Sequence, residues 1–249
     1  MKYFVIVFSF FLLVSCARSK SELTAQSIVD RAIEKACSGN CERAIIDFTF
    51  RDRCYIRARN GSVFNYERIT SDSNGVTRDI LSNDRFERYR NDTLLVIPDS
   101  MAVKYANSVN SVHYFSQLPY GLNDLAVRKA LLGSCTINGK PYHKIRVTFS
   151  EDKGGKDFED VFIYWIHKEL FTVDFIAYSY ITDGGGIRFR EAYNPRVIEG
   201  IRFVDYRNYK PLEPSAKLLQ TDSLFEAKQL VLLSTIQTEA VGVTLISEN

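Results

Sequence analysis

The chain has 249 residues, with 32 lysines and arginines against 30 aspartates and glutamates. Because these charges nearly balance, the composition argues against a nucleic-acid partner, whose binding depends on neutralising phosphates. The 14 tyrosines and 17 phenylalanines favour pleated, half-buried surfaces and indicate a mainly β protein. The length suits one large β domain.

The N-terminus has the features of a secretory signal. A single lysine precedes an apolar run that is much shorter than the ~20 residues needed to cross a bilayer. The run ends at Leu13-Val14-Ser15-Cys16, which resembles the lipobox of bacterial lipoproteins. The resemblance implies that residues 1–15 are a removed signal peptide and that Cys16 carries a diacylglyceryl anchor.

The residues after Cys16 predict a location and a boundary. Residues 16–21 are polar and are expected to form a tether, and residues 22–249 are expected to form a single domain. Ala17 follows the cysteine, which in enteric sorting favours the outer membrane. We therefore expect an outer-membrane lipoprotein of the cell envelope that faces the periplasm and is held to the membrane by its acyl anchor.

The domain is expected to begin with a helix at residues 22–37. Apolar side chains recur there at helical spacing, Ser19-x-x-Glu22 resembles a capping box, and Gly39 provides a stop. The four remaining cysteines, Cys37, Cys41, Cys54 and Cys135, allow one or two disulfides in an oxidising compartment, and their connectivity is open. A break at Gly39 would let the Cys37 and Cys41 thiols meet, but two free thiols are an equal alternative.

From residue 44 the apolar period changes to that of strands. Turn signals such as Asn60-Gly61 and Asn138-Gly139 separate the expected strands. These strands cover residues 44–51, 63–66, 76–81, 85–90, 93–97, 142–149, 158–167, 171–180, 187–193, 201–209 and 229–246. A helix-plus-loop insertion is expected at residues 100–132, and a short helix at 222–228. This order predicts a mainly β fold: residues 45–209 form one strongly curved antiparallel sheet, an open half-barrel, with the N-terminal helix and inserted helices.

Several glycine-flanked blocks resemble an uncharacterised domain family of Gram-negative outer-membrane lipoproteins. They are residues 154–165 (GGKDFEDVFIYW), 184–190 (GGGIRFR), 200–206 (GIRFVDY) and 118–124 (LPYGLND). The layout also resembles the lipoprotein-carrier architecture of LolA and LolB. That resemblance implies a curved sheet that wraps helices and leaves an apolar cavity, but fold alone does not fix function.

Candidate ligand-binding residues come from the strands with apolar side chains on both faces. In residues 171–180 both faces are apolar or aromatic, which a strand covered on one side would not need. One face can pack on helices while the other lines a cavity for an acyl chain; a two-sided filled core is the alternative. The candidates are Tyr164, Phe175, Tyr178, Phe189 and Phe203, with Arg188 and Arg190 as a possible clamp for an anionic head group. Ion pairs between these arginines and nearby carboxylates are the more ordinary expectation.

The sequence offers little for catalysis. It has no Gly-x-Ser-x-Gly elbow and no phosphate loop, and its three histidines are scattered singly, so we expect no metal site, no cofactor and no enzymatic activity. The sequence therefore favours a lipid-anchored envelope protein that binds an apolar ligand or a lipid-modified partner in a carrier-like cavity. The alternative is a non-catalytic structural or interaction lipoprotein with a filled core.

Overall fold

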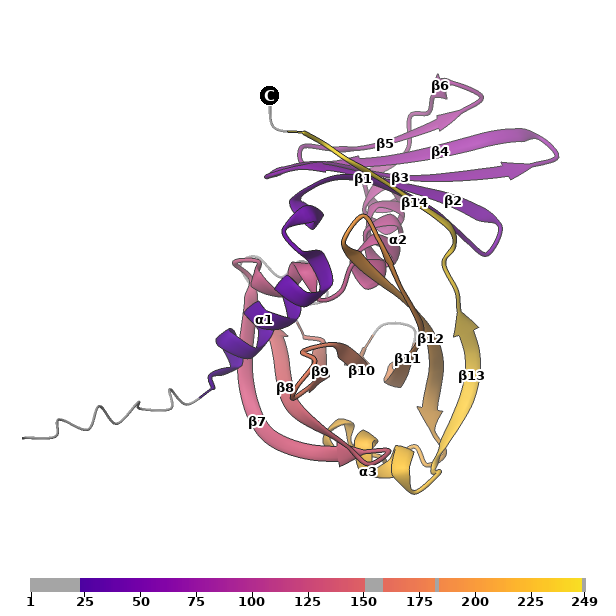
Figure 1. The fold of residues 1–249 in the computed structure, drawn as a ribbon. Helices are drawn as coiled ribbons and strands as arrows, with labels where there is room; N and C mark the ends of the chain where they lie inside the picture. The colour runs from indigo at the N-terminus through magenta and orange to yellow at the C-terminus, as the bar shows by residue number, and fades with distance from the viewer. Residues whose placement is uncertain (1–22, 151–158, 182–183, 248–249) are drawn as a thin grey trace, which may run out of the picture.

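The computed structural model describes residues 23–150, 159–181 and 184–247. The expected signal peptide, Cys16 and the tether lie outside these residues. Within the described parts, the strands form two seven-stranded antiparallel sheets rather than the expected single sheet. Figure 1 shows the first sheet as a flat layer and the second sheet curling strongly beside it. The mainly β, open half-barrel class predicted from the sequence is confirmed, and its division into two sheets is a correction.

The first sheet has the strand order β14-β1-β2-β3-β4-β5-β6. Its strands are β1 (Arg43–Phe50), β2 (Arg53–Asn60), β3 (Val63–Asp72), β4 (Gly75–Ser82), β5 (Phe86–Arg90), β6 (Thr93–Leu94) and β14 (Glu239–Leu245). The hairpin from β2 to β3 turns at Asn60-Gly61, as predicted, with Asn60 opposite Val63.

The second sheet has the order β13-β12-β11-β10-β9-β8-β7. Its strands are β7 (Val127–Ile137), β8 (Lys140–Phe149), β9 (Val161–His167), β10 (Val173–Tyr180), β11 (Gly186–Ile198), β12 (Ile201–Pro211) and β13 (Leu230–Ile236). The insertion expected at residues 100–132 is therefore shorter, because β7 begins at Val127. This edge strand is largely exposed and lacks clean apolar alternation, so its pattern gave no strand signal.

The expected last strand, residues 229–246, is two strands in different sheets. β13 pairs with β12, whereas β14 crosses over and pairs with β1. The break between them is held by polar contacts: the backbone N–H of Thr238 donates to the Asp205 carboxylate at 3.1 Å, and Arg196 donates to the Thr238 carbonyl. These bonds satisfy the backbone N–H and C=O groups of Thr238, at the point where the chain passes from the second sheet to the first.

The N-terminal helix α1 (Ala25–Cys37) begins later than predicted. Its capping box is formed by Thr24 and Ser27, not by the Ser19-x-x-Glu22 pattern, which lies outside the described residues. Ser38 ends the helix in the left-handed region, and the short helix η1 (Asn40–Glu42) follows. This turn brings Cys37 and Cys41 together in a disulfide. Cys54 and Cys135 are free thiols.

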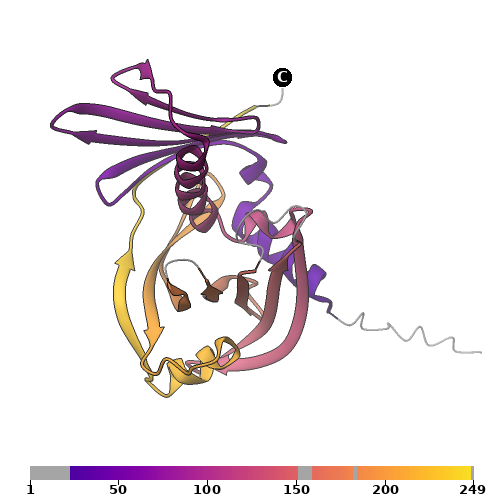
Figure 2. The same cartoon turned by 180° about the vertical axis from the view of Figure 1, so that it is seen from behind.

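Two more helices cover different faces of the second sheet. The helix α2 (Asp99–Ser116), followed by η2 (Tyr120–Asn123), passes from the first sheet toward the concave side of the second (Figure 2). The helix α3 (Thr221–Glu226), preceded by η5 (Leu218–Gln220), lies at the end of the second sheet that is remote from the first. The two faces of the second sheet are therefore covered by different helices.

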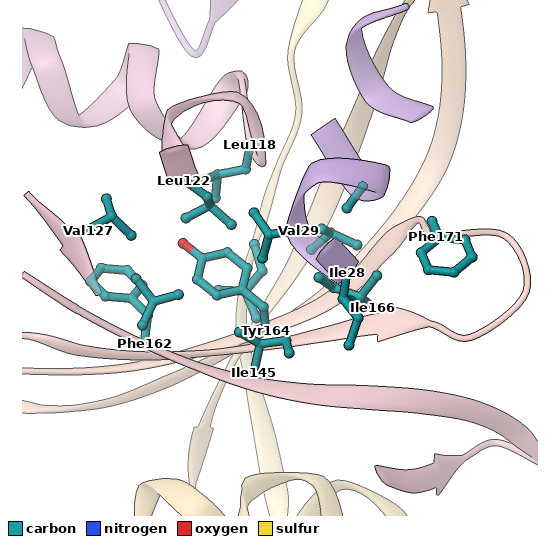
Figure 3. Packing of buried hydrophobic residues seen from close by; sticks show 14 of the residues in the cluster. Ile28, Val29, Leu118, Leu122, Val127, Ile145, Phe162, Tyr164, Ile166 and Phe171 are labelled. Atoms are coloured by element: carbon teal, nitrogen blue, oxygen red, sulfur yellow. The ribbon is translucent and has the colours of Figure 1, made fainter. Parts of the chain in front are cut away.

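Three apolar cores follow from this arrangement. The first lies between α1, η2 and the concave face of the second sheet, where Ile28 and Val29 pack near Tyr164 and Leu122 (Figure 3). A second core joins the end of α1 to β1 and β12. A third lies on the opposite face of the second sheet, where Phe225 of α3 packs near Phe189, with ring centroids 4.9 Å apart. The prediction of strands that are apolar on both faces is thus confirmed.

Candidate ligand-binding groove

Two adjoining cavities lie between the C-terminal half of α2 and the concave face of the second sheet. The first has a volume of about 450 Å³ and the second about 180 Å³. Ser111 and Phe115 of α2 line both, so we name the pair the α2 groove. Other lining residues are Asn110, Tyr114, Phe149, Asp160, Phe162, Tyr178, Tyr180 and Arg188 in the first cavity, and Phe50, Val112, Ser116, Arg190, Val204, Tyr206, Ile236 and Thr238 in the second.

Strand register brings the sheet side of the groove together. Tyr178 of β10 lies opposite Phe162 of β9 on one side and opposite Arg188 of β11 on the other. Directly opposed residues of an antiparallel pair point to the same face, so these three side chains share the concave face. The Phe162 and Tyr178 rings stack with centroids 5.2 Å apart. The ring centroid of Phe115 of α2 lies 5.5 Å from that of Tyr178.

Arg190 lines the second cavity and is only 8% exposed. Its guanidinium lies 3.9 Å from the Phe115 ring centroid and donates to the Tyr178 hydroxyl at 2.9 Å. Its Nε atom is buried with no hydrogen-bond partner among the described residues. Burying a guanidinium without a counterion is costly, so this charge is poised to accept one from a ligand.

The ion pairs expected for the two arginines of β11 are not found among the described residues. Arg188 instead lies 5.1 Å from the centroid of the Tyr180 ring and donates to the Ile187 carbonyl. Arg202 of β12 does pair with a carboxylate, that of Asp174, at 3.4 Å. The physical reason is alternation: Arg188 and Arg190 point to the concave, aromatic face, where Arg188 lies against the Tyr180 ring and Arg190 against the Phe115 ring.

The floor of the groove contains buried tyrosines that stay uncharged. The Tyr114 and Tyr164 hydroxyls lie 3.3 Å apart, and burial raises the pKa of Tyr114 to about 12. Burial also raises the pKa of Tyr206 to about 12, although the nearby cations of Arg190 and Arg202 oppose the shift. These phenols are therefore neutral at physiological pH and present an aromatic surface suited to apolar groups.

The structure sorts the predicted site residues into four places. Tyr178, Arg188 and Arg190 line the α2 groove, and Tyr164 lies fully buried beside it in the first core. Phe175 and Phe189 are on the opposite face, packed near Phe225. Phe203 lies in the core between α1 and β1. Phe175 is three residues from Tyr178, so strand alternation puts it on the opposite face. The register shift between Val173 and Phe175 instead brings Val173 to the concave face, in the first core.

The helix side of the groove was missed by sequence reasoning. Ser111, Tyr114 and Phe115 were not singled out, although an aromatic pair near the end of an inserted helix was a usable signal. Among the residues that the structure describes, no group of three or more His, Cys, Asp or Glu side chains could hold a metal ion. No helix in the described ranges is both long and apolar enough to span a membrane.

Both the sequence and the fold are similar to those of known proteins. Residues 1–238 match the family of unknown function DUF6503. No curated protein matches the sequence significantly. The structure is similar to the LolA superfamily protein NE2245 from Nitrosomonas europaea, with 13% sequence identity, 92% of this chain and 96% of that chain covered, and a TM-score of 0.50.

A second similar structure is that of a DUF1329 family protein from Desulfovibrio piger, which has 12% identity, covers 87% of this chain and 92% of its own, and gives a TM-score of 0.44. At these identities the likeness concerns the fold alone. The LolA-like architecture expected from the sequence is confirmed, and the chain belongs to the DUF6503 family.

Proposed function

We propose that this protein is a lipid-anchored envelope protein that binds an acyl chain, free or attached to a lipid-modified partner, in the α2 groove. The observation that carries the proposal is the groove itself: cavities of about 450 and 180 Å³ meet at Phe115 on the concave face of a LolA-like sheet. The larger cavity falls within the range of about 300–1,000 Å³ typical of small-molecule sites.

The lining chemistry suits a hydrocarbon chain. Phe115, Phe162 and Tyr178 present ring surfaces, and the buried phenols nearby are neutral. Each methylene moved from water into such a site contributes ~0.8 kcal/mol. Ten methylenes would contribute about 8 kcal/mol, close to the free energy of micromolar binding, before the cost of ordering the chain is subtracted.

Arg190 gives the groove a preferred orientation for its ligand. It carries a buried cation whose Nε atom lacks a partner among the described residues, and it lines the smaller, mostly apolar cavity. A carboxylate at the end of an acyl chain would neutralise this charge and accept from Nε. We therefore favour an anionic amphiphile over a neutral hydrocarbon.

The proposed location rests on the sequence of the N-terminus. The lipobox places an acyl anchor on Cys16, and Ala17 favours the outer membrane, with the domain facing the periplasm. In this setting the role is binding rather than catalysis, and it needs no cofactor or nucleic-acid partner. An anchored protein with an acyl-binding groove would receive or hold lipid at the membrane surface.

A fluorescent fatty-acid titration with a blocking variant tests the proposal. Ser111 is exposed on α2 and lines both cavities, so Ser111→Trp should fill their junction without disturbing a core. We expect saturable binding to the wild type and at least about tenfold weaker binding to Ser111→Trp, a loss of about 1.4 kcal/mol. Val103→Trp, on the same helix but outside the groove, is the matched control and should bind as the wild type does.

The filled-core alternative predicts a different result. If the wild type shows no saturable probe binding, or if both tryptophan variants reduce binding equally, the groove is not the site and the protein is better described as a structural or interaction lipoprotein. Circular dichroism of all three proteins establishes that a lost signal reflects the groove rather than unfolding.

A further inference from the structure

A separate, polar cavity of about 260 Å³ lies on the other side of α2, against the first sheet. Strands β2 and β3, helix α2, η2 and the start of β7 enclose it. Its lining residues are Arg57, Arg59, Tyr66, Asn110, His113, Tyr114, Gln117, Tyr120, Gly121, Asp124, Ala126, Val127 and Phe149. We name it the polar cavity, and it plays no part in the function proposed above.

Two arginines give the polar cavity its charge. Arg57 and Arg59 are two residues apart on β2 and so share one face of the strand, with guanidinium carbons 5.2 Å and 5.1 Å from the Tyr120 ring centroid. Arg57 is 1% exposed and donates through Nη2 to the Cys41 carbonyl, while its Nη1 has no partner among the described residues. Arg59 donates to the Gly61 carbonyl and weakly to the Tyr66 hydroxyl.

Neither guanidinium forms an ion pair with a carboxylate of the described residues. The acid in the lining is Asp124, whose charge raises the pKa of Arg59 although its carboxylate lies beyond ion-pair distance of the guanidinium. Two like charges thus face one cavity with only partial compensation, and burial lowers the pKa of Arg57. An anion placed between the two arginines would relieve both their mutual repulsion and their desolvation.

The same cavity also presents two buried acceptors without donors. His113 is 1% exposed, and its Nε2–H donates to the Glu67 carbonyl at 3.0 Å, which leaves Nδ1 as an acceptor. That Nδ1 and the Oε1 of Gln117, a residue 8% exposed, have no partner among the described residues. Unpaired buried polar atoms destabilise a protein, so a ligand that pairs with them binds more tightly.

We propose that the polar cavity binds a phosphate group that carries a proton. Its charged oxygens would accept from Arg57 and Arg59, and its P–OH would donate to Nδ1 of His113 or to Oε1 of Gln117. Sulfate and carboxylate anions supply acceptors but no donor, so they match only half of the site. Arg59 is half-buried and would meet the ligand first. The unpaired Arg57 Nη1 and Gln117 Oε1 are buried in the free protein, so binding would require rotation about their terminal torsions.

The source of the phosphate is either free phosphate or a lipid whose head group is a phosphate monoester, as in phosphatidic acid, because the phosphodiester of other phospholipids carries no P–OH. The polar cavity shares Asn110, Tyr114 and Phe149 with the larger cavity of the α2 groove. A phosphate seated beside the arginines thus has an apolar path leading away from it. The phosphate site itself stands on its own polar contacts, whether or not the groove holds an acyl chain.

Isothermal titration calorimetry of the full-length protein at pH 6.0 tests the proposal. Near this pH about half of a phosphate monoester is singly protonated, and the pKa of His113, about 4, keeps that ring neutral. We expect inorganic phosphate to bind with one site per chain and at least tenfold more tightly than sulfate. Binding of dihexanoyl phosphatidic acid at least tenfold tighter than inorganic phosphate would identify a lipid head group, and equal or weaker binding would identify free phosphate.

Variants at the cavity provide the matched controls. Arg59→Gln should weaken phosphate binding about 10- to 100-fold, because a charge-assisted hydrogen bond is lost. Arg146→Gln removes the same charge from an exposed position on β8 and should change nothing. Gln117→Leu should reduce the preference for phosphate over sulfate. No measurable phosphate binding to the wild type, or an equal loss in Arg59→Gln and Arg146→Gln, would overturn the proposal.

Discussion

Acidification should destabilise this protein through His113. The ring of this residue is enclosed by aromatic neighbours, edge-on to Phe48 and Tyr55 and stacked on Tyr66 with centroids 4.8 Å apart. Burial, with a smaller contribution from Arg57, lowers its pKa from 6.5 to about 4. Between pH 6.5 and 4 the His113 imidazole is therefore protonated in the unfolded chain and neutral in the folded protein.

The sign and size of the effect follow from linkage. A depressed pKa in the folded state means that stability is fully present above pH 6.5 and is lost as the pH falls toward 4. The difference between a pKa of 6.5 in the unfolded chain and about 4 in the folded protein corresponds to about 3 kcal/mol when the loss is complete. Between pH 7.5 and 5.0 the expected loss is about 2 kcal/mol.

Urea unfolding at pH 7.5 and 5.0 measures this loss, with the emission of Trp165 as the probe. Trp165 is the protein's one tryptophan and is fully buried in the third core. His113→Phe keeps an aromatic ring but cannot titrate, and it loses stability at both pH values because the bond to the Glu67 carbonyl is gone. The wild type should lose about 2 kcal/mol more than the variant on acidification. Parallel losses in the two proteins would refute the reasoning.

Three further predictions concern the disulfide, a buried ion-pair network and the anchor. Replacing Cys37 and Cys41 with serine should lower the free energy of unfolding by about 2 kcal/mol, the loop-closure entropy of this short link, and dithiothreitol should remove the difference from the wild type in chemical denaturation. Asp79→Asn should lower the free energy of unfolding by about 3–5 kcal/mol, because the carboxylate that accepts from the buried Arg68 and from Arg88 loses its charge. A loss below about 1 kcal/mol would contradict this. Cys16→Ser should abolish labelling with palmitate and leave the precursor uncleaved, and continued labelling would disprove the anchor.

Local signals in the sequence predicted most of the strands. Asn60-Gly61 and Asn138-Gly139 both turn the chain between paired strands, because each dipeptide accepts positive φ at low cost. Alternating apolar side chains identified the strands of the second sheet's centre. Pairing partners were beyond these signals: Ala44 lies opposite Leu245, and only the folded structure shows that contact. The division into two sheets depends on such distant pairings.

The sequence predicted the side chains that the second sheet contributes to the candidate site. Tyr178, Arg188 and Arg190 came from strand alternation, which is a local property. The side chains that α2 contributes could not be predicted, because the contact between Phe115 and Tyr178 depends on where α2 docks. Val173 also shows the limit of alternation, because the register shift between Val173 and Phe175 puts these two side chains in cores on opposite faces of the sheet. Local periodicity thus predicts which side chains share a strand face, but not which face meets the cavity.

Native mass spectrometry of the purified protein tests the central claim most directly. The mass of the same preparation under denaturing conditions includes the covalent anchor, so any additional mass under native conditions is a non-covalent ligand. We predict an excess that matches an acyl lipid and that is lost in Ser111→Trp but kept in Val103→Trp. Identical native and denatured masses for the wild type, together with no mass increase after addition of a long-chain fatty acid, would contradict the account.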